Sequence, residues 1–121
     1  MILLGADHGG VGLKDAIKKY LEQNAIACKD FGTFDTESID YVPIASKVAH
    51  GVVKGEGEYG ILCCGTGIGM SIAANKVDGI RAAVCSDSYC VEMTECSLHG
   101  RTCDRRTESG RIGQSLFINR V

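Results

Sequence analysis

The chain has 121 residues and a formal net charge of −2, and 45% of its residues are apolar. This length suits a single domain with one core, and the apolar content argues against intrinsic disorder. The small charge argues against a nucleic-acid partner or an anionic membrane surface, and no apolar run approaches the ~20 residues of a membrane span.

The seven cysteines favour a reducing compartment. Their odd number, and the adjacent pair Cys63-Cys64 at the end of an apolar run, indicate thiols rather than a disulfide framework. No CxxC pair is present, which argues against a zinc ribbon. The chain starts with the apolar run Ile2-Leu3-Leu4 instead of a basic leader. We therefore predict a cytoplasmic protein.

Strands and helices are predicted to alternate along the first 95 residues. The predicted strands cover 1–5, 26–28, 59–64 and 79–85, and the predicted helices cover 13–23, 43–53 and 70–76. The first helix has one apolar face, made of Leu13, Ile17, Tyr20 and Leu21. The second helix places four apolar residues inward, Ile44, Ala45, Val48 and Val52, and Pro43 suits its first turn. This alternation predicts βαβ units and an α/β fold with a parallel sheet.

The pattern changes from Cys96 onward. Residues 100–114 contain four arginines and almost no apolar periodicity, and only Leu116-Phe117-Ile118 offers an apolar anchor. Burial of such a small apolar surface compensates only a small part of the conformational entropy that the tail would lose on ordering. We assign this tail no element and expect it to make few native contacts. The chain is thus divided into an α/β domain, 1–95, and an atypical C-terminal segment, 96–121.

A glycine loop, Cys64-Gly65-Thr66-Gly67-Ile68-Gly69, joins the third predicted strand to a helix. Ligands of open α/β sheets bind at the carboxyl ends of strands, where the loop N–H groups and the helix dipole attract negative charge. Such a loop suits a phosphate or an enediolate oxygen, and it lowers the pKa of a thiol at its edge from ~8.5. Cys64 is therefore a candidate general base.

Two other interpretations of this loop stay open. In the first interpretation, Cys64 is a buried structural cysteine beside a tight turn. The second is a dinucleotide-binding loop, but its spacing is GxGxG instead of GxGxxG.

Asp7-His8-Gly9-Gly10 follows the first predicted strand and should reach the same edge of the sheet. Both polar side chains suit hydrogen bonds to sugar hydroxyls, and His8 suits proton transfer near neutral pH. The alternative is that Asp7 caps the next helix and His8 is merely exposed.

Taken together, these segments resemble the ribose-5-phosphate isomerase B and galactose-6-phosphate isomerase family. The resemblance covers about residues 1–95. It is carried by Gly5–Gly10, Lys29–Thr33, Ser38–Tyr41, Gly60–Lys76 and Gly79–Ala83. The long run Gly60–Lys76 is its most specific part.

The resemblance implies a Rossmann-like three-layer α/β domain that forms a homodimer or higher homo-oligomer and needs no metal or cofactor. It implies aldose–ketose isomerisation of a sugar phosphate through an enediolate, with ribose 5-phosphate to ribulose 5-phosphate as the first expectation. Cys64 would move the proton between C1 and C2, with Thr66 as the second catalytic residue. The implied substrate-binding residues are Asp7, His8, Tyr41, Gly65, Gly67, Ile68 and Gly69.

Alternatives remain for several of these assignments. Tyr41 is a simple packing residue in one of them. In the other two, the whole chain is a galactose-6-phosphate isomerase subunit or a non-catalytic phosphosugar-binding domain.

The resemblance ends near residue 95. Ser97 stands where the family has a ring-opening histidine in a His-Asn-Asp-Ala run, and His99, two residues later, is the remaining candidate. The family's tail supplies a strand, a helix and phosphate-binding arginines, and none of its motifs is present here. A rival interpretation makes Cys90, Cys96, His99 and Cys103 a metal site, which a metal assay on the purified protein tests.

A frameshift near residues 94–97 is one hypothesis for this break. Permitted codons for Glu95–Gly113, read one base over, spell a histidine at position 97 and Gly-Arg-Arg-Val-Val-Gly from position 106. The nucleotide sequence of the gene tests this directly, and the hypothesis fails if no frame encodes that run.

Overall fold

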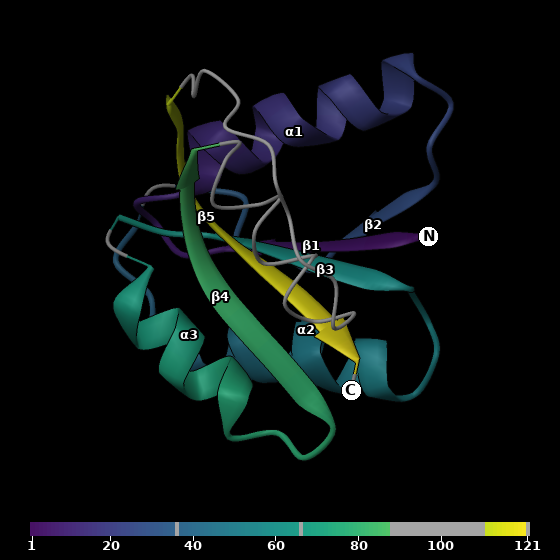
Figure 1. Ribbon diagram of the computed structural model, residues 1–121. Helices are drawn as coiled ribbons and strands as arrows, with labels where there is room; N and C mark the ends of the chain where they lie inside the picture. The colour runs from purple at the N-terminus through teal and green to yellow at the C-terminus, as the bar shows by residue number, and fades with distance from the viewer. Residues whose placement is uncertain (36, 66, 88–110, 121) are drawn as a thin grey trace.

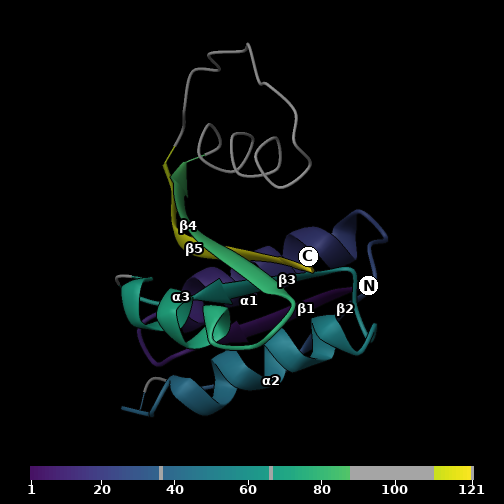
Figure 2. The same cartoon turned by 60° about the horizontal axis from the view of Figure 1, so that its bottom comes forward.

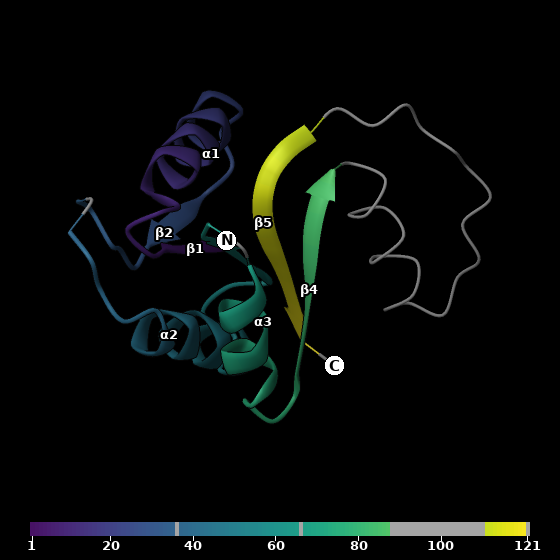
Figure 3. The same ribbon diagram turned by 90° about the vertical axis from the view of Figure 1, so that its left-hand side faces the viewer.

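A computed structural model of the protein describes residues 1–35, 37–65, 67–87 and 111–120, with 86, 87 and 111–120 as backbone alone. The elements are β1 (Ile2–Ala6), α1 (Val11–Gln23), β2 (Cys28–Asp30), α2 (Val42–Val53), β3 (Tyr59–Cys63), α3 (Ile68–Asn75), β4 (Ile80–Asp87) and β5 (Arg111–Arg120). Helix α1 covers one face of the sheet, and α2 and α3 cover the other (Figures 1 and 3). The predicted three-layer α/β architecture is confirmed.

The sheet has the strand order β2-β1-β3-β5-β4. Strand β1 pairs in parallel with β2 and β3, as the alternation of elements predicted. Helices on both faces bury these strands, so that Leu3 and Leu4, which point to opposite faces, are both fully buried. The carboxyl ends of β1 and β3 therefore meet at one edge of the sheet.

Helix α2 has the predicted inward face. Its four predicted core residues are all buried, namely Ile44, Ala45, Val48 and Val52. Helix α1 differs from its prediction, because Tyr20 is 62% exposed and the buried positions are Val11, Lys14 and Leu21. The apolar periodicity therefore placed α1 on the sheet correctly but missed a buried lysine.

Strand β5 overturns the expectation for the tail. It lies between β3 and β4 and pairs antiparallel with both, so that Ile61 and Ala83 flank Phe117 from either side. Figure 2 shows β4 and β5 side by side along their length. The apolar run Leu116-Phe117-Ile118 lies within this strand, so the one apolar anchor of the tail falls in the element that pairs. The predicted scarcity of native contacts is therefore wrong for 111–120.

Strand β4 is the edge strand beside β5, and a side chain covers part of it. The Asn75 amide donates to the Ala82 carbonyl oxygen at 2.9 Å and accepts from the Ala82 N–H at 2.8 Å. These bonds satisfy an edge peptide and fix the end of α3 to β4. None of the helices in the described part of the chain could span a lipid bilayer.

Deleting residues 98–121 should destabilise the protein strongly, because it strips a paired strand from between β3 and β4. We expect the melting temperature to fall by roughly 10 °C or more in a domain of this size, measured by circular dichroism. Phe117→Pro, in mid-strand, should cost more than Arg120→Pro, at the strand end. A truncated chain that melts within a few degrees of the full chain would contradict this role of β5.

Candidate functional site

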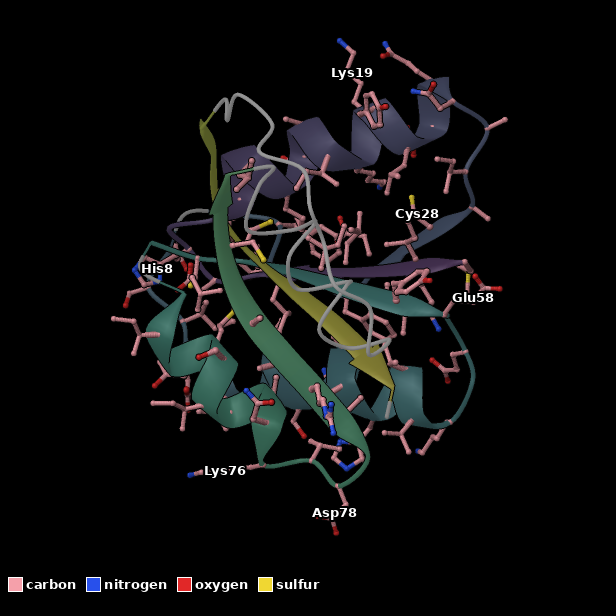
Figure 4. All side chains as sticks on the ribbon, in the orientation of Figure 1. His8, Lys19, Cys28, Glu58, Lys76 and Asp78 are labelled. Atoms are coloured by element: carbon pink, nitrogen blue, oxygen red, sulfur yellow. The ribbon has the colours of Figure 1, made fainter. Side chains whose placement is uncertain are left out.

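Two loops leave the sheet at the edge where β1 and β3 end. One is Asp7–Gly10, between β1 and α1, and the other is Cys64–Gly67, between β3 and α3. Figure 4 shows His8 at the edge from which α3 starts, whereas Cys28 and Glu58 lie at the opposite edge. The predicted meeting of these two segments is found in the structure.

The two loops are in direct contact through their backbones. The Asp7 N–H donates to the Cys63 carbonyl oxygen at 3.1 Å. A Cβ atom built on Gly10 would overlap that same carbonyl, and one built on Gly9 would lie 3.4 Å from the Gly65 nitrogen. Position 10 therefore tolerates no side chain, and both loops keep a fixed relation to each other.

Asp7 does not cap α1, so this alternative from the sequence is wrong. The N-cap residue of α1 is Gly10, and no side chain caps the helix. The Asp7 carboxylate instead accepts from the Gly9 N–H at 2.9 Å, which forms an Asx turn within the loop. This turn holds a half-buried carboxylate at the edge of the sheet.

His8 is exposed and reaches the segment that follows β2. Its Nδ1 accepts from the Ile39 N–H at 3.4 Å. With Nδ1 as an acceptor, the neutral ring carries its proton on Nε2, where it is available as a donor.

Tyr41 stands at the start of α2 and contacts the first turn of α3. A Cβ atom built on Gly69 would lie 2.5 Å from both Cζ and Oη of Tyr41. The absence of a side chain at Gly69 thus lets the phenol lie on the helix that follows the glycine loop. Tyr41 remains 37% exposed, so its hydroxyl is not sealed inside the core.

Cys64 has its sulfur at the amino terminus of α3. The Gly67 N–H donates to the Cys64 Sγ at 2.6 Å, and Gly67 is the N-cap residue with φ of 76°. A hydrogen bond donated to sulfur and the helix dipole both favour the thiolate, whereas the burial of Cys64 favours the neutral thiol. Within the glycine loop, Gly65 and Ile68 are exposed, whereas Gly67 is buried against Val84.

Cys64 is 7% exposed and belongs to the hydrophobic core, and Cys63, one residue earlier, points to the other face of the sheet. It is fully buried, and burial raises its pKa from 9.0 to about 12, with a further increase from the neighbouring Cys64. Lys14 lowers this pKa, but by less than burial raises it. Cys63 is therefore a neutral thiol at physiological pH.

A buried charge that the sequence did not reveal lies behind the site. Lys14 is 0% exposed, and its Nζ lies 2.9 Å from Asp30 Oδ2 and 3.1 Å from Asp30 Oδ1. The only signal in the sequence was a lysine among the apolar residues at the start of the predicted first helix. Its partner, sixteen residues away, could not be identified without the fold.

Several predicted residues lie outside the described part of the chain. These are Thr66, His99, Cys90, Cys96 and Cys103. Within the described part, no three His, Cys, Asp or Glu side chains gather in a way that would hold a metal ion.

A groove of about 510 Å³ runs between α2 and α3. Tyr41 and Gly69 line the end nearest the site, and His50, Lys76 and Asp78 line it further away. Cys64 is not among its lining residues. The groove therefore borders the site but does not contain its candidate base.

Comparison with known proteins places the chain in one family. The sequence model of the family described as "Ribose/Galactose Isomerase" matches residues 2–101. Ribose-5-phosphate isomerase B of Escherichia coli is 47% identical over 93 residues, which are 77% of this chain and 62% of the relative. D-erythrulose-4-phosphate isomerase of Pectobacterium atrosepticum is 45% identical over 97 residues, which are 79% of this chain and 64% of the relative.

A solved structure agrees with these matches. Ribose-5-phosphate isomerase B of Clostridium thermocellum superposes with a TM-score of 0.76 at 51% identity, covering 78% of this chain and 64% of that one. The chain thus spans less than two thirds of the length of these relatives.

The raised pKa of Cys63 should make the protein sensitive to alkali. Above pH 9.0 the unfolded thiol loses its proton while the folded thiol keeps it up to about pH 12. The unfolded state then binds fewer protons, so this group should lower the free energy of unfolding by about 1.4 kcal/mol per pH unit in that window. Urea unfolding of wild type and Cys63→Ala between pH 8 and 11 measures the difference in slope.

Cys28→Ala, at a half-buried thiol on the opposite edge, is the matched control and should keep the wild-type slope. Parallel pH dependences of wild type and Cys63→Ala would show that Cys63 does not carry this effect.

Proposed function

This chain belongs to the ribose/galactose isomerase family, and we propose that it interconverts an aldose phosphate and a ketose phosphate through an enediolate. The observation that carries the proposal is the Cys64 sulfur, held at the amino terminus of α3 by the Gly67 N–H. A thiolate in this position suits the removal of a proton from a carbon next to a carbonyl group. The first substrate we propose is ribose 5-phosphate, with ribulose 5-phosphate as the product.

Cys64 moves the proton in this mechanism. Its thiolate takes the proton from C2 of the open-chain aldose, and the C–H electrons form the C1–C2 double bond of the enediolate. The negative charge passes to O1. The protonated sulfur then returns the proton to C1, while the O2 proton passes to O1, which leaves a ketone at C2. Atoms and charge balance without a cofactor or metal.

The oxygen that gains charge needs hydrogen-bond donors fixed in advance. We assign this role to Thr66 and to N–H groups between Gly65 and Gly69, which precede or open α3. The helix dipole adds a positive partial charge at the same place. The Gly67 N–H is engaged by Cys64, so in this proposal it stabilises the base instead of the substrate oxygen.

The sugar is held from the opposite loop in this proposal. Asp7 and His8 stand at the edge reached by β1, and Tyr41 lies on the first turn of α3. The His8 Nε2 proton and the Tyr41 hydroxyl are donors to sugar oxygens, and the Asp7 carboxylate accepts from sugar hydroxyls. His99 is the proposed ring-opening residue.

We also propose a homodimer or higher homo-oligomer that acts in the cytoplasm. Helix α3 exposes Ile68 and Ile72, one turn apart, at 62% and 55%. Val42, at the start of α2, is 46% exposed. Exposed apolar side chains so close to the candidate site suit an interface between copies. Cys28 and Cys63 are thiols, which fits a reducing compartment.

Cys64→Ala should abolish isomerisation of ribose 5-phosphate while leaving the fold intact. General-base catalysis is worth ~10²-fold to 10⁴-fold, and we expect a loss of kcat in this range. Cys63→Ala is the matched control, because its side chain points to the other face of β3, and it should keep most of the activity. Product formation and far-ultraviolet circular dichroism measure the two effects.

Galactose 6-phosphate and erythrulose 4-phosphate should be assayed beside ribose 5-phosphate. Activity on either of them would change the substrate that we assign but not the proposed enediolate mechanism. If the protein binds a phosphosugar but converts none of the three, it is a phosphosugar-binding domain and not an isomerase. Equal losses of isomerase activity in Cys63→Ala and Cys64→Ala would show that Cys64 is not the general base.

A further inference from the structure

The buried ammonium of Lys14 is a charge for which the proposed mechanism has no use. Besides the Asp30 carboxylate, Nζ donates to the Thr33 carbonyl oxygen at 2.6 Å. The Phe34 ring, itself 71% exposed, has its centroid 4.5 Å from the ammonium and shields it from water. A buried lysine stays charged only when such partners replace its hydration. The charge therefore requires the chain after β2 to stay in this place.

Lys14 also lies directly behind the loop that carries Asp7 and His8. Its backbone N–H donates to the Gly10 carbonyl oxygen at 2.9 Å, in the first turn of α1. The side chain then reaches across to Asp30 at the end of β2. One residue thus connects the loop after β1 to the segment after β2.

This segment extends the sheet before it turns toward the site. The Asp30 carboxylate accepts from the Gly32 N–H at 2.8 Å. The Gly32 carbonyl oxygen accepts from the Ala6 N–H at 2.7 Å, and the Thr33 N–H donates to the Ala6 carbonyl oxygen at 2.8 Å. Residues 30–33 are thereby held against the end of β1, immediately before Asp7.

The chain beyond residue 33 has a different character and carries two contacts to the site. Residues 34, 35 and 37–40 are exposed. Ile39 nonetheless donates to His8, and Tyr41 lies against Gly69. The position of this exposed stretch therefore depends on where its first residues are fixed, and that is at the end of β1 and at the buried Lys14–Asp30 pair.

We propose that Lys14 is a positioning residue for the substrate site: its buried ion pair with Asp30 fixes residues 30–35 and 37–41 so that His8 and Tyr41 stay in place beside the glycine loop. The consequence for catalysis rests on the proposed isomerase function. Lys14 touches neither Cys64 nor α3 through any of its described hydrogen bonds or ion pairs. Its loss should therefore weaken substrate binding more than the proton transfer at Cys64.

Two variants and one control test this proposal. Lys14→Met keeps the length of the side chain and removes the charge, and Asp30→Asn keeps the shape of the partner and removes its charge. Lys19→Met, on the exposed outer part of α1, makes the same chemical change away from the site (Figure 4). Hydrogen exchange of individual amides, followed by NMR, is the readout that does not depend on activity.

We expect faster exchange of the Thr33 and Ile39 amides in Lys14→Met and Asp30→Asn, with the Leu4 amide of β1 still protected. The effect at Ile39 distinguishes positioning of the whole segment from local damage near Asp30. Lys19→Met should exchange like wild type. Lys14→Arg, which keeps a charged donor, should restore part of the protection. Wild-type exchange at Ile39 in both charge-removing variants would overturn the proposal.

Kinetics then test the catalytic consequence. We expect KM to rise by ~10-fold to 10²-fold in both variants with a smaller change in kcat, since displaced binding groups cost affinity. A fall in kcat alone, with KM unchanged, would overturn the inference. If Lys14→Met does not fold, the exchange and kinetic measurements on Asp30→Asn decide whether the proposal holds. If the wild-type chain isomerises no sugar phosphate, the proposed function fails, while the exchange experiment still decides the role of Lys14.

Discussion

Two backbones meet at the site, where a Cβ atom added to Gly10 would overlap the carbonyl of Cys63. Any side chain at position 10 would push the first loop off the end of β3. The Asp7 N–H donates to the same carbonyl, so one peptide oxygen fixes both ends of the Asp7–Gly10 loop. This constraint and the parallel pairing of β1 with β3 bring the polar residues of the first loop and the thiol of the second together. No attraction between their side chains is required.

The adjacent residues Cys63 and Cys64 place their sulfur atoms in different surroundings. Successive side chains point to opposite faces, so the two sulfurs have different surroundings although they are adjacent in sequence. The Cys63 thiol is desolvated, and its pKa is raised to about 12. The Cys64 sulfur accepts a peptide N–H at a helix start. Both thiols are buried, but only the second accepts a hydrogen bond from a peptide N–H at a helix start.

Much of this arrangement could be predicted from local sequence. The apolar runs located β1 and β3, apolar periodicity located α2, and the spacing of glycines indicated that a loop would present Cys64 at a helix start. Lys14 and β5 were missed for a common reason: their partners are distant in sequence. A lysine in a helix is read as a solvated charge unless its carboxylate is known, and Asp30 follows a different element. Strand β5 contains the apolar run Leu116-Phe117-Ile118, but its partners β3 and β4 come much earlier in the chain, so the run alone did not identify a paired strand.

Strand β5 nevertheless bears on the site, because its residues 115–119 each pair with both β3 and β4. Ser115 lies opposite Cys63 on β3 and opposite Cys85 on β4, and Leu116 lies opposite Leu62 and Val84. Val84 is the residue that packs against Gly67, and Gly67 donates the hydrogen bond to Cys64. The separation of β3 and β4 at this level is therefore set by the backbone of β5. The segment that least resembles the family thus helps to fix the geometry of the loop that most resembles it.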